Sequence, residues 1–200
     1  MPDRRGIFVA IVGPSGAGKD TLLSLARQAL QDCPGIRFAR RVITRDADGA
    51  TEDHDTLDVA SFQEARTRGD FCLSWEAHGL CYGLPASIAL ELAAGNVVVA
   101  NMSRRSLDLA AGIFGGIDVV EITARPELLI DRLTARGRET PEEIAARVAR
   151  YAPVDRPASA IGFLSIDNSD DVSAAAGQLA RHLKSRTRAA DDPSISSRSA

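Results

Sequence analysis

The sequence predicts an α/β fold in which helices cover both faces of a mostly parallel sheet. Two continuous apolar runs, at 7–12 and 97–100, and a mostly apolar segment at 119–123 predict strands that are buried on both faces. Helical segments lie between these runs, and such alternation is typical of parallel strands joined by crossover helices. A length of 200 residues, with 44% apolar and 26% charged residues, fits one globular domain.

The N-terminal half contains further elements around these strands. Residues 21–31 carry an apolar stripe at helical spacing, which predicts a helix that ends before Pro34 and Gly35. The pattern Ser61-Phe62-Gln63-Glu64 predicts a capping box that opens a short helix. The other expected elements are a weak strand at 36–43, an acidic loop at 46–58, a strand at 71–75 and a helix at 85–94.

The C-terminal half predicts two linked helices, a last strand and a last helix. Pro126 suits the first turn of a helix that ends near Ala135, and Thr140-Pro141-Glu142-Glu143 predicts a capping box for a helix that ends near Tyr151. A strand at 163–166 and a helix at 172–183 follow. Residues 185–200 contain few apolar side chains, which predicts a disordered tail after a single domain at 6–184.

A glycine-rich segment between the first strand and the first helix carries the main chemical signal. It has the composition of a P-loop, in which backbone N–H groups and a helix N-terminus surround the phosphates of ATP. Lys19 is the expected catalytic cation on the β- and γ-phosphates. The expected ATP-binding residues are Gly13, Pro14, Ser15, Gly16, Ala17, Gly18, Lys19, Asp20 and Thr21.

The position after the P-loop lysine is Asp20, where serine or threonine usually binds Mg²⁺. Two interpretations remain open from the sequence. Asp20 binds the metal or a metal-bound water, or Asp20 is an acid favoured by the helix dipole and Thr21 serves the metal. Mg²⁺ is the expected cofactor in both cases.

Two groups of arginines follow the P-loop. The segment Arg41-x-x-Thr44-Arg45 suits bidentate phosphate binding, although alone it also fits a solvated basic strand end. Arginines also flank a glycine break between two predicted helices, as expected for a lid that brings cations to the site on closing, or for a charged surface helix pair. The lid arginines are Arg132, Arg136, Arg138 and Arg147.

The order of these parts resembles the guanylate kinase family over roughly residues 6–184. The resemblance implies a P-loop kinase fold with an acceptor-binding region at 37–90 and a lid at 126–152. It also implies that Arg132, Arg136 and Arg147 act in catalysis and that Arg45 and Tyr82 hold the acceptor phosphate. The full set of expected acceptor-binding residues is Arg41, Arg45, His54, Trp75, Tyr82, Asn101 and Arg104.

Three positions depart from that family. Leu73 stands where guanylate kinases read guanine with a carboxylate, Asn101 replaces part of an acidic strand end, and His54 replaces a phosphate-binding tyrosine. With these departures the chain resembles the ribose 1,5-bisphosphate phosphokinase family of phosphonate breakdown, through segments 13–22, 41–45, 74–83 and 101–104. That resemblance implies phosphoryl transfer from ATP to the 1-phosphate of ribose 1,5-bisphosphate. The second phosphate of this acceptor calls for an additional cation, and the candidates are Arg104 and Arg105, which fit a solvated helix start equally well.

Composition restricts the partners and the location. A formal net charge of -3 gives no broad positive field for nucleic acid, and no apolar run is long enough to span a membrane. The N-terminus lacks a signal peptide pattern, so a cytoplasmic enzyme with the small-molecule substrates ATP and a phosphorylated sugar is expected. A nucleoside monophosphate kinase and a non-catalytic interaction module of the same fold are the alternatives. The oligomeric state stays open.

Overall fold

The computed structural model describes residues 5–45, 54–77, 79–137, 139–149, 154 and 156–190. Its centre is sheet A, which has the strand order β2-β7-β1-β8-β9 and only parallel pairings. The predicted parallel α/β fold is therefore confirmed. The strands of sheet A are β2 (Ile36–Phe38), β7 (Val97–Asn101), β1 (Ile7–Val12), β8 (Ile117–Thr123) and β9 (Ala160–Asp167).

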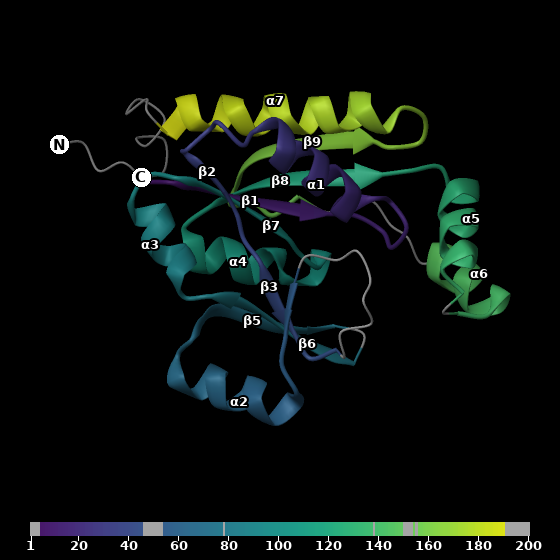
Figure 1. Ribbon diagram of the computed structural model, residues 1–200, viewed down its shortest axis with the longest axis horizontal. Helices are drawn as coiled ribbons and strands as arrows, with labels where there is room; N and C mark the ends of the chain where they lie inside the picture. The colour runs from purple at the N-terminus through teal and green to yellow at the C-terminus, as the bar shows by residue number, and fades with distance from the viewer. Residues whose placement is uncertain are drawn as a thin grey trace.

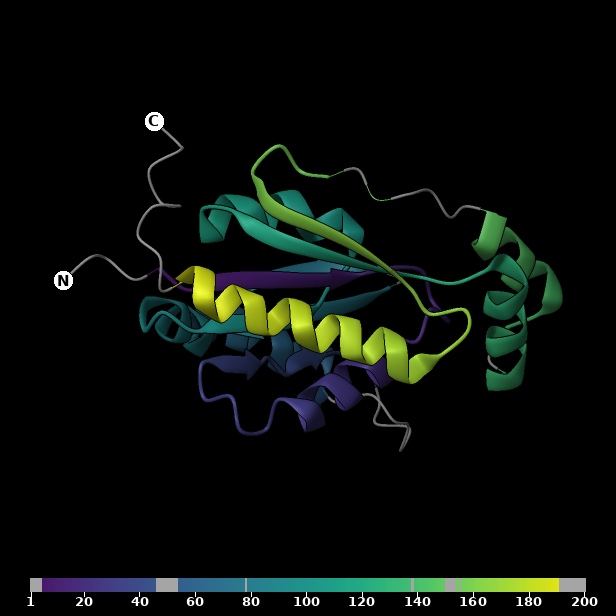
Figure 2. The same cartoon turned by 90° about the horizontal axis from the view of Figure 1, so that it is seen from above.

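Helices bury both faces of sheet A. On one face, α1 (Lys19–Ala29) and α7 (Val172–Ala190) contribute Leu22 and Leu179 to a buried apolar cluster, and Figure 2 shows α7 running along the sheet. On the other face, α3 (Ser87–Ala93) and α4 (Leu107–Phe114) pack on a second cluster. Burial on both sides explains why these strands read as continuous apolar runs.

A smaller sheet B lies beside sheet A. Its strand order is β4-β3-β6-β5, and α2 (Val59–Arg68) packs against β5 and β6 (Figure 1). The single strand predicted at 36–43 is wrong, because the chain crosses between β2 of sheet A and β3 of sheet B there. Sheet B contains β3 (Arg41–Ile43), β4 (His54–Thr56), β5 (Phe71–Ala77) and β6 (Leu80–Pro85).

Several predicted boundaries change in sheet B. The loop expected at 46–58 contains β4, and its residues 46–53 lie outside the described part of the chain. Residues 80–85 form β6, so α3 begins only at Ser87. The cap of α2 is Asp58, whose carboxylate accepts a hydrogen bond from the Ser61 backbone N–H at 2.9 Å. This hydrogen bond lowers the pKa of Asp58, and the capping box predicted from Ser61 is wrong.

The region predicted to be a lid contains α5 (Pro126–Arg136) and α6 (Pro141–Ala149), which stand together at one end of the molecule (Figure 1). Gly137 ends α5 with a left-handed φ of 62°. The capping box of α6 is confirmed, because Thr140 N–H donates to Glu143 and Glu143 N–H donates to the Thr140 hydroxyl. Residues 150–153, where this helix was expected to end, lie outside the described residues.

The last helix is longer than predicted. α7 continues through residues 185–190, which the sequence assigned to a disordered tail. The cause is a long-range ion pair, since Arg186 and His182 on α7 both contact the fully buried carboxylate of Asp118 on β8. Residues 191–200 lie outside the described residues. No helix in the described ranges has the length and apolar character needed to cross a membrane.

Candidate active site

The P-loop joins the carboxyl end of β1 to the N-terminus of α1. Gly13 and Gly18 have φ values of 144° and 86°, which side chains rarely adopt. A Cβ at Gly13 would collide with the carbonyl oxygen of Ile122, and one at Gly18 would collide with the amide nitrogen of Asn168. The two glycines are therefore required by both backbone conformation and space, as expected for a loop that wraps closely around phosphate.

Lys19 is the first residue of α1, and its side chain folds back over the loop. Its Nζ donates to the carbonyl oxygens of Gly13 and Pro14 at 3.0 and 2.9 Å. These contacts hold the ammonium group beside the backbone N–H groups of the loop. The structure therefore brings the predicted cation to the helix N-terminus, where anion binding is favoured.

Arg132 lies behind the loop and braces it from α5. Its guanidinium donates to the carbonyl oxygens of Gly16 at 3.2 Å and Asn168 at 3.0 Å. The side-chain amide of Asn168, which is 3% exposed, donates to the carbonyl oxygen of Ala17 at 2.8 Å. Sequence reasoning missed Asn168, because a lone asparagine after a strand carries no signal of its distant partner.

The other lid arginines lie apart from the loop. Arg136 is exposed in the last turn of α5, and Arg147 on α6 pairs with Glu139 at 2.8 Å. Arg138 lies outside the described residues. The structure therefore brings only Arg132 of the predicted lid cations into contact with the P-loop.

Asp20 faces a groove between α1 and sheet A. Its Oδ1 accepts a hydrogen bond from the side-chain amide of Asn101 at 2.7 Å, and Asn101 is buried at the end of β7. Thr21 is exposed on the next position of the helix. The groove has a volume of about 290 Å³ and is also lined by Arg41. It thus joins one predicted P-loop residue to two predicted acceptor-binding residues.

Four predicted acceptor residues gather on sheet B. Trp75 and Tyr82 stack with centroids 5.4 Å apart and an interplanar angle of 7°, and the Arg41 guanidinium lies 5.8 Å from the Tyr82 centroid. His54 is paired with Arg41 across β4 and β3, and its buried Nδ1 has no hydrogen-bond partner among the described residues. The geometry suits a polar ligand held against aromatic rings.

Two further predicted acceptor residues follow strands of the two sheets. Arg45 follows β3 two residues after its end, and its Nε is buried. Arg104 lies in a short 3-10 turn (Arg104–Ser106) that follows β7. Arg104 does not line the groove beside Asp20.

Leu73 belongs to the hydrophobic core. It is 3% exposed and packs in the same cluster as Leu84 and Ile88. The position at which guanylate kinases read guanine is therefore apolar and buried in this chain. A carboxylate at this point would need partners that the surrounding apolar side chains do not supply.

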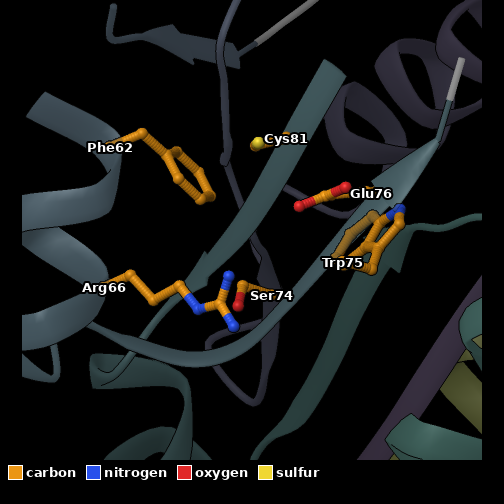
Figure 3. A pocket seen from close by; sticks show the side chains of 6 residues that line it. All are labelled: Phe62, Arg66, Ser74, Trp75, Glu76 and Cys81. Carbon is orange, nitrogen blue, oxygen red and sulfur yellow. The ribbon is translucent and has the colours of Figure 1, made fainter. Parts of the chain in front are cut away.

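A second cavity of about 240 Å³ lies on the α2 side of sheet B. Figure 3 shows Arg66 reaching from α2 toward Ser74, with the Phe62 ring beside Cys81. Side chains alternate along a strand, so Ser74 shares its face with Glu76, whereas Leu73 and Trp75 pack toward the core of the domain. Trp75 also lines this cavity, so the cavity lies next to one ring of the Trp75–Tyr82 stack.

Comparisons with known proteins identify close relatives. No family model matches the chain. The ribose 1,5-bisphosphate phosphokinase PhnN of Brucella melitensis is 49% identical over 179 residues, which cover 90% of this chain and 92% of that protein. The phosphokinase of the same name from Chelativorans sp. is 43% identical, with 92% and 88% covered.

A solved structure supports the fold. The crystal structure of guanylate kinase from Anaplasma phagocytophilum matches with a TM-score of 0.65 and 18% sequence identity, and the match covers 94% of this chain and 89% of that chain. At this identity the likeness concerns the fold alone. It confirms the guanylate-kinase-like arrangement that the sequence predicted.

Proposed function

This chain belongs to the ribose 1,5-bisphosphate phosphokinase family, and we propose that it transfers the γ-phosphoryl group of ATP to the 1-phosphate of ribose 1,5-bisphosphate. The products are ADP and 5-phosphoribosyl 1-diphosphate. The observation that carries this proposal is identity of 43–49% to such phosphokinases along nearly the whole length of both chains. The P-loop geometry around Lys19 supports the binding of ATP, the phosphoryl donor of this reaction.

The proposed reaction needs no general base. The acceptor is a phosphate oxygen that is already ionised at neutral pH, so it attacks the γ-phosphorus without losing a proton to the protein. Catalysis then consists of alignment and of charge neutralisation between two anionic substrates. Lys19 and the N–H groups of the P-loop neutralise the transferring phosphate, and Arg132 keeps the loop in position through Gly16.

The acceptor is assigned to the cluster on sheet B. We propose that Arg45 and Tyr82 hold the 1-phosphate, with His54 and Trp75 beside them and Arg41 where the sugar enters the groove beside Asp20. The buried Nδ1 of His54 supports this assignment, because a buried polar atom without a protein partner is expected to bind a ligand or water. Arg136 and Arg147 then act when the lid at 126–152 closes over both substrates.

Mg²⁺ fits the proposed site through Asp20. Magnesium in phosphoryl-transfer enzymes is held by one or two protein oxygens together with substrate phosphates and waters, so a dedicated cluster of protein ligands is not required. The Asp20 carboxylate lies one residue after Lys19 and is oriented by Asn101, whereas Thr21 is exposed. When bound, the metal would offset the negative charge of the ATP phosphates, with Asp20 as the residue that would hold it.

The groove beside Asp20 has a volume of about 290 Å³, near the small end of the ~300–1,000 Å³ typical of ligand pockets, and the proposed sugar phosphate is a small acceptor. Because ATP is a co-substrate, we place the reaction in the cytoplasm. By the family resemblance, we assign it to phosphonate breakdown.

The decisive experiment compares two acceptors on one preparation. We expect kcat/KM for ribose 1,5-bisphosphate to exceed that for GMP by orders of magnitude, with 5-phosphoribosyl 1-diphosphate identified as the product. GMP turnover equal to or faster than that of the sugar would overturn the proposal and indicate a nucleoside monophosphate kinase. Failure to bind ATP would indicate a non-catalytic module instead.

A further inference from the structure

The groove beside Asp20 runs along one face of α1. Asp20, Leu23, Ser24 and Arg27 all line it, and their spacing of three, four and seven residues places them on one side of the helix. Seven residues correspond to about 10 Å along a helix axis at 1.5 Å per residue. The groove therefore extends about two helical turns from the P-loop, and Arg27 stands at its far end.

The chemistry of the lining changes along this length. At the P-loop end, the Asp20 carboxylate, which we propose as the metal ligand, accepts a hydrogen bond from the Asn101 amide. Apolar side chains of Leu23 and Val99 line the walls, together with Arg41. At the far end the Arg27 guanidinium lies 5.3 Å from the centroid of the Phe38 ring, which also lines the groove. The groove thus has a carboxylate at one end and a guanidinium at the other.

The Arg27 guanidinium lies over the Phe38 ring within the range of a cation–π interaction. The donors with which arginine binds phosphate in bidentate fashion lie in the guanidinium plane. Arginine is also the side chain best suited to phosphate recognition, because its fork matches two oxygens of the anion. The far end of the groove therefore has the chemistry of a phosphate-binding site.

We propose that Arg27 binds the 5-phosphate of the sugar acceptor and selects a bisphosphate over a monophosphate, an inference that rests on the proposed function. The reacting 1-phosphate must lie near Lys19, and the ribose ring and its methylene group separate the second phosphate from it. That separation matches a groove that begins beside the P-loop and ends at Arg27. The sequence predicted Arg104 or Arg105 for this role, but neither lines the groove.

The test measures kcat/KM for ribose 1,5-bisphosphate and for ribose 1-phosphate, through ADP formation. We expect Arg27→Ala to lower the value for the bisphosphate by about 10- to 100-fold, as for the loss of a hydrogen bond between charged groups, with little change for ribose 1-phosphate. Arg27→Lys should give an intermediate ratio, because lysine keeps the charge without the fork. Arg181→Ala, an exposed arginine on α7, is the matched control and should leave both values unchanged.

The outcomes separate the inference from the proposed function. Equal losses on both acceptors in Arg27→Ala, or no loss on either, would overturn the inference and leave the kinase assignment intact. Loss of the bisphosphate preference in Arg104→Ala instead of Arg27→Ala would place the second phosphate beyond β7 and also overturn it. A wild-type enzyme with no turnover of ribose 1,5-bisphosphate would overturn the proposed function and the inference with it.

Discussion

Sheet A and sheet B differ in how firmly they hold the groups that face the substrates. The central strands β7, β1 and β8 of sheet A are buried along almost their whole length, and the P-loop at their carboxyl end is tied to Arg132 and Asn168. In sheet B, β3 and β4 have three residues each, and the acceptor side chains mainly stack on one another. The proposed phosphoryl-transfer groups are thus preorganised, whereas the proposed acceptor residues of sheet B lie on a smaller and more open layer.

This difference follows from what each region has to do. Electrostatic stabilisation of a transition state is effective when charges and dipoles are already in place and need no reorganisation. An acceptor site must admit and release a substrate, so partly exposed side chains serve it better. The two regions should therefore respond differently to substitution.

The largest effect is expected at the P-loop. Lys19→Ala removes a preorganised charge at the transferring phosphate, and turnover should fall by ~10²- to 10³-fold, or about 2.7–4 kcal/mol. The fold should remain, because Nζ contacts only loop carbonyl groups in the contacts described for it and the residue lies outside the apolar core. Steady-state rates and a thermal melt check both points. A folded variant with nearly wild-type turnover would contradict the kinase mechanism.

The next effect tests whether position 73 belongs to the acceptor site or to the core. From the sequence, Leu73→Glu would be expected to raise GMP turnover by restoring a base-reading acid. The structure predicts loss of stability instead, because the carboxylate would be buried without a partner beside Leu84 and Ile88. We expect the free energy of unfolding to fall by roughly 3 kcal/mol.

Denaturant unfolding of Leu73→Glu and of Leu73→Met measures this effect. The methionine variant preserves apolar volume and should lose less than about 1.5 kcal/mol. A stable Leu73→Glu variant with increased GMP turnover would show that this side chain reaches the acceptor. In that case position 73 would belong to a base-reading site like that of guanylate kinases, and not to the hydrophobic core.

The sequence predicted sheet A well and sheet B poorly, for a physical reason. Strands buried on both faces are mostly apolar, so β1 and residues 97–100 of β7 are visible as continuous apolar runs, and β8 as an apolar segment interrupted by Asp118 and Glu121. The β4 segment His54-Asp55-Thr56 has no such pattern, because it is a short, partly exposed edge strand. Its existence depends on pairing with β3, and that contact carries no local signal.

The candidate site shows the same division. The P-loop could be predicted because all its residues are adjacent in the chain. The Arg132 contact with Gly16 joins residues 116 positions apart, and the groove from Asp20 to Arg27 needs walls from two strands of sheet A. Such arrangements arise only when the chain folds, so the sequence placed Arg132 in a lid and did not identify Arg27.

A smaller effect is expected at the end of α7. Truncation after Ser185 removes Arg186 from the buried Asp118 carboxylate, which then keeps His182 alone among its described side-chain partners. The loss should be about 2 kcal/mol, typical of a hydrogen bond to a charged group, and should lower Tm by several degrees. Arg186→Ala should reproduce most of this loss.

Truncation after Ala190 is the matched control. Residues 191–200 contain a single large apolar residue, Ile195, so their removal should leave Tm nearly unchanged. Together, the two truncations test whether residues 185–190, which were expected to belong to a disordered tail, contribute to the stability of the domain. If both left Tm unchanged, the Asp118 ion pair would contribute nothing to stability and α7 would be held by its apolar face alone.

The smallest effect distinguishes the braced arginine from the lid arginine. Arg132 contacts the P-loop in the free enzyme, so Arg132→Ala should weaken ATP binding by ~10-fold through loss of the loop brace, with a smaller change in kcat. Arg136 is exposed on the open lid, so Arg136→Ala should lower kcat and leave the Kd for ATP unchanged. Equilibrium ATP titration and single-turnover rates separate the two effects, with Arg132→Lys as a control that keeps the charge.

If both alanine variants lowered ATP affinity and rate by the same factor, the arginines would act as one group of ground-state contacts. The distinction between a preorganised P-loop and arginines that contact the substrates only after lid closure would then be wrong.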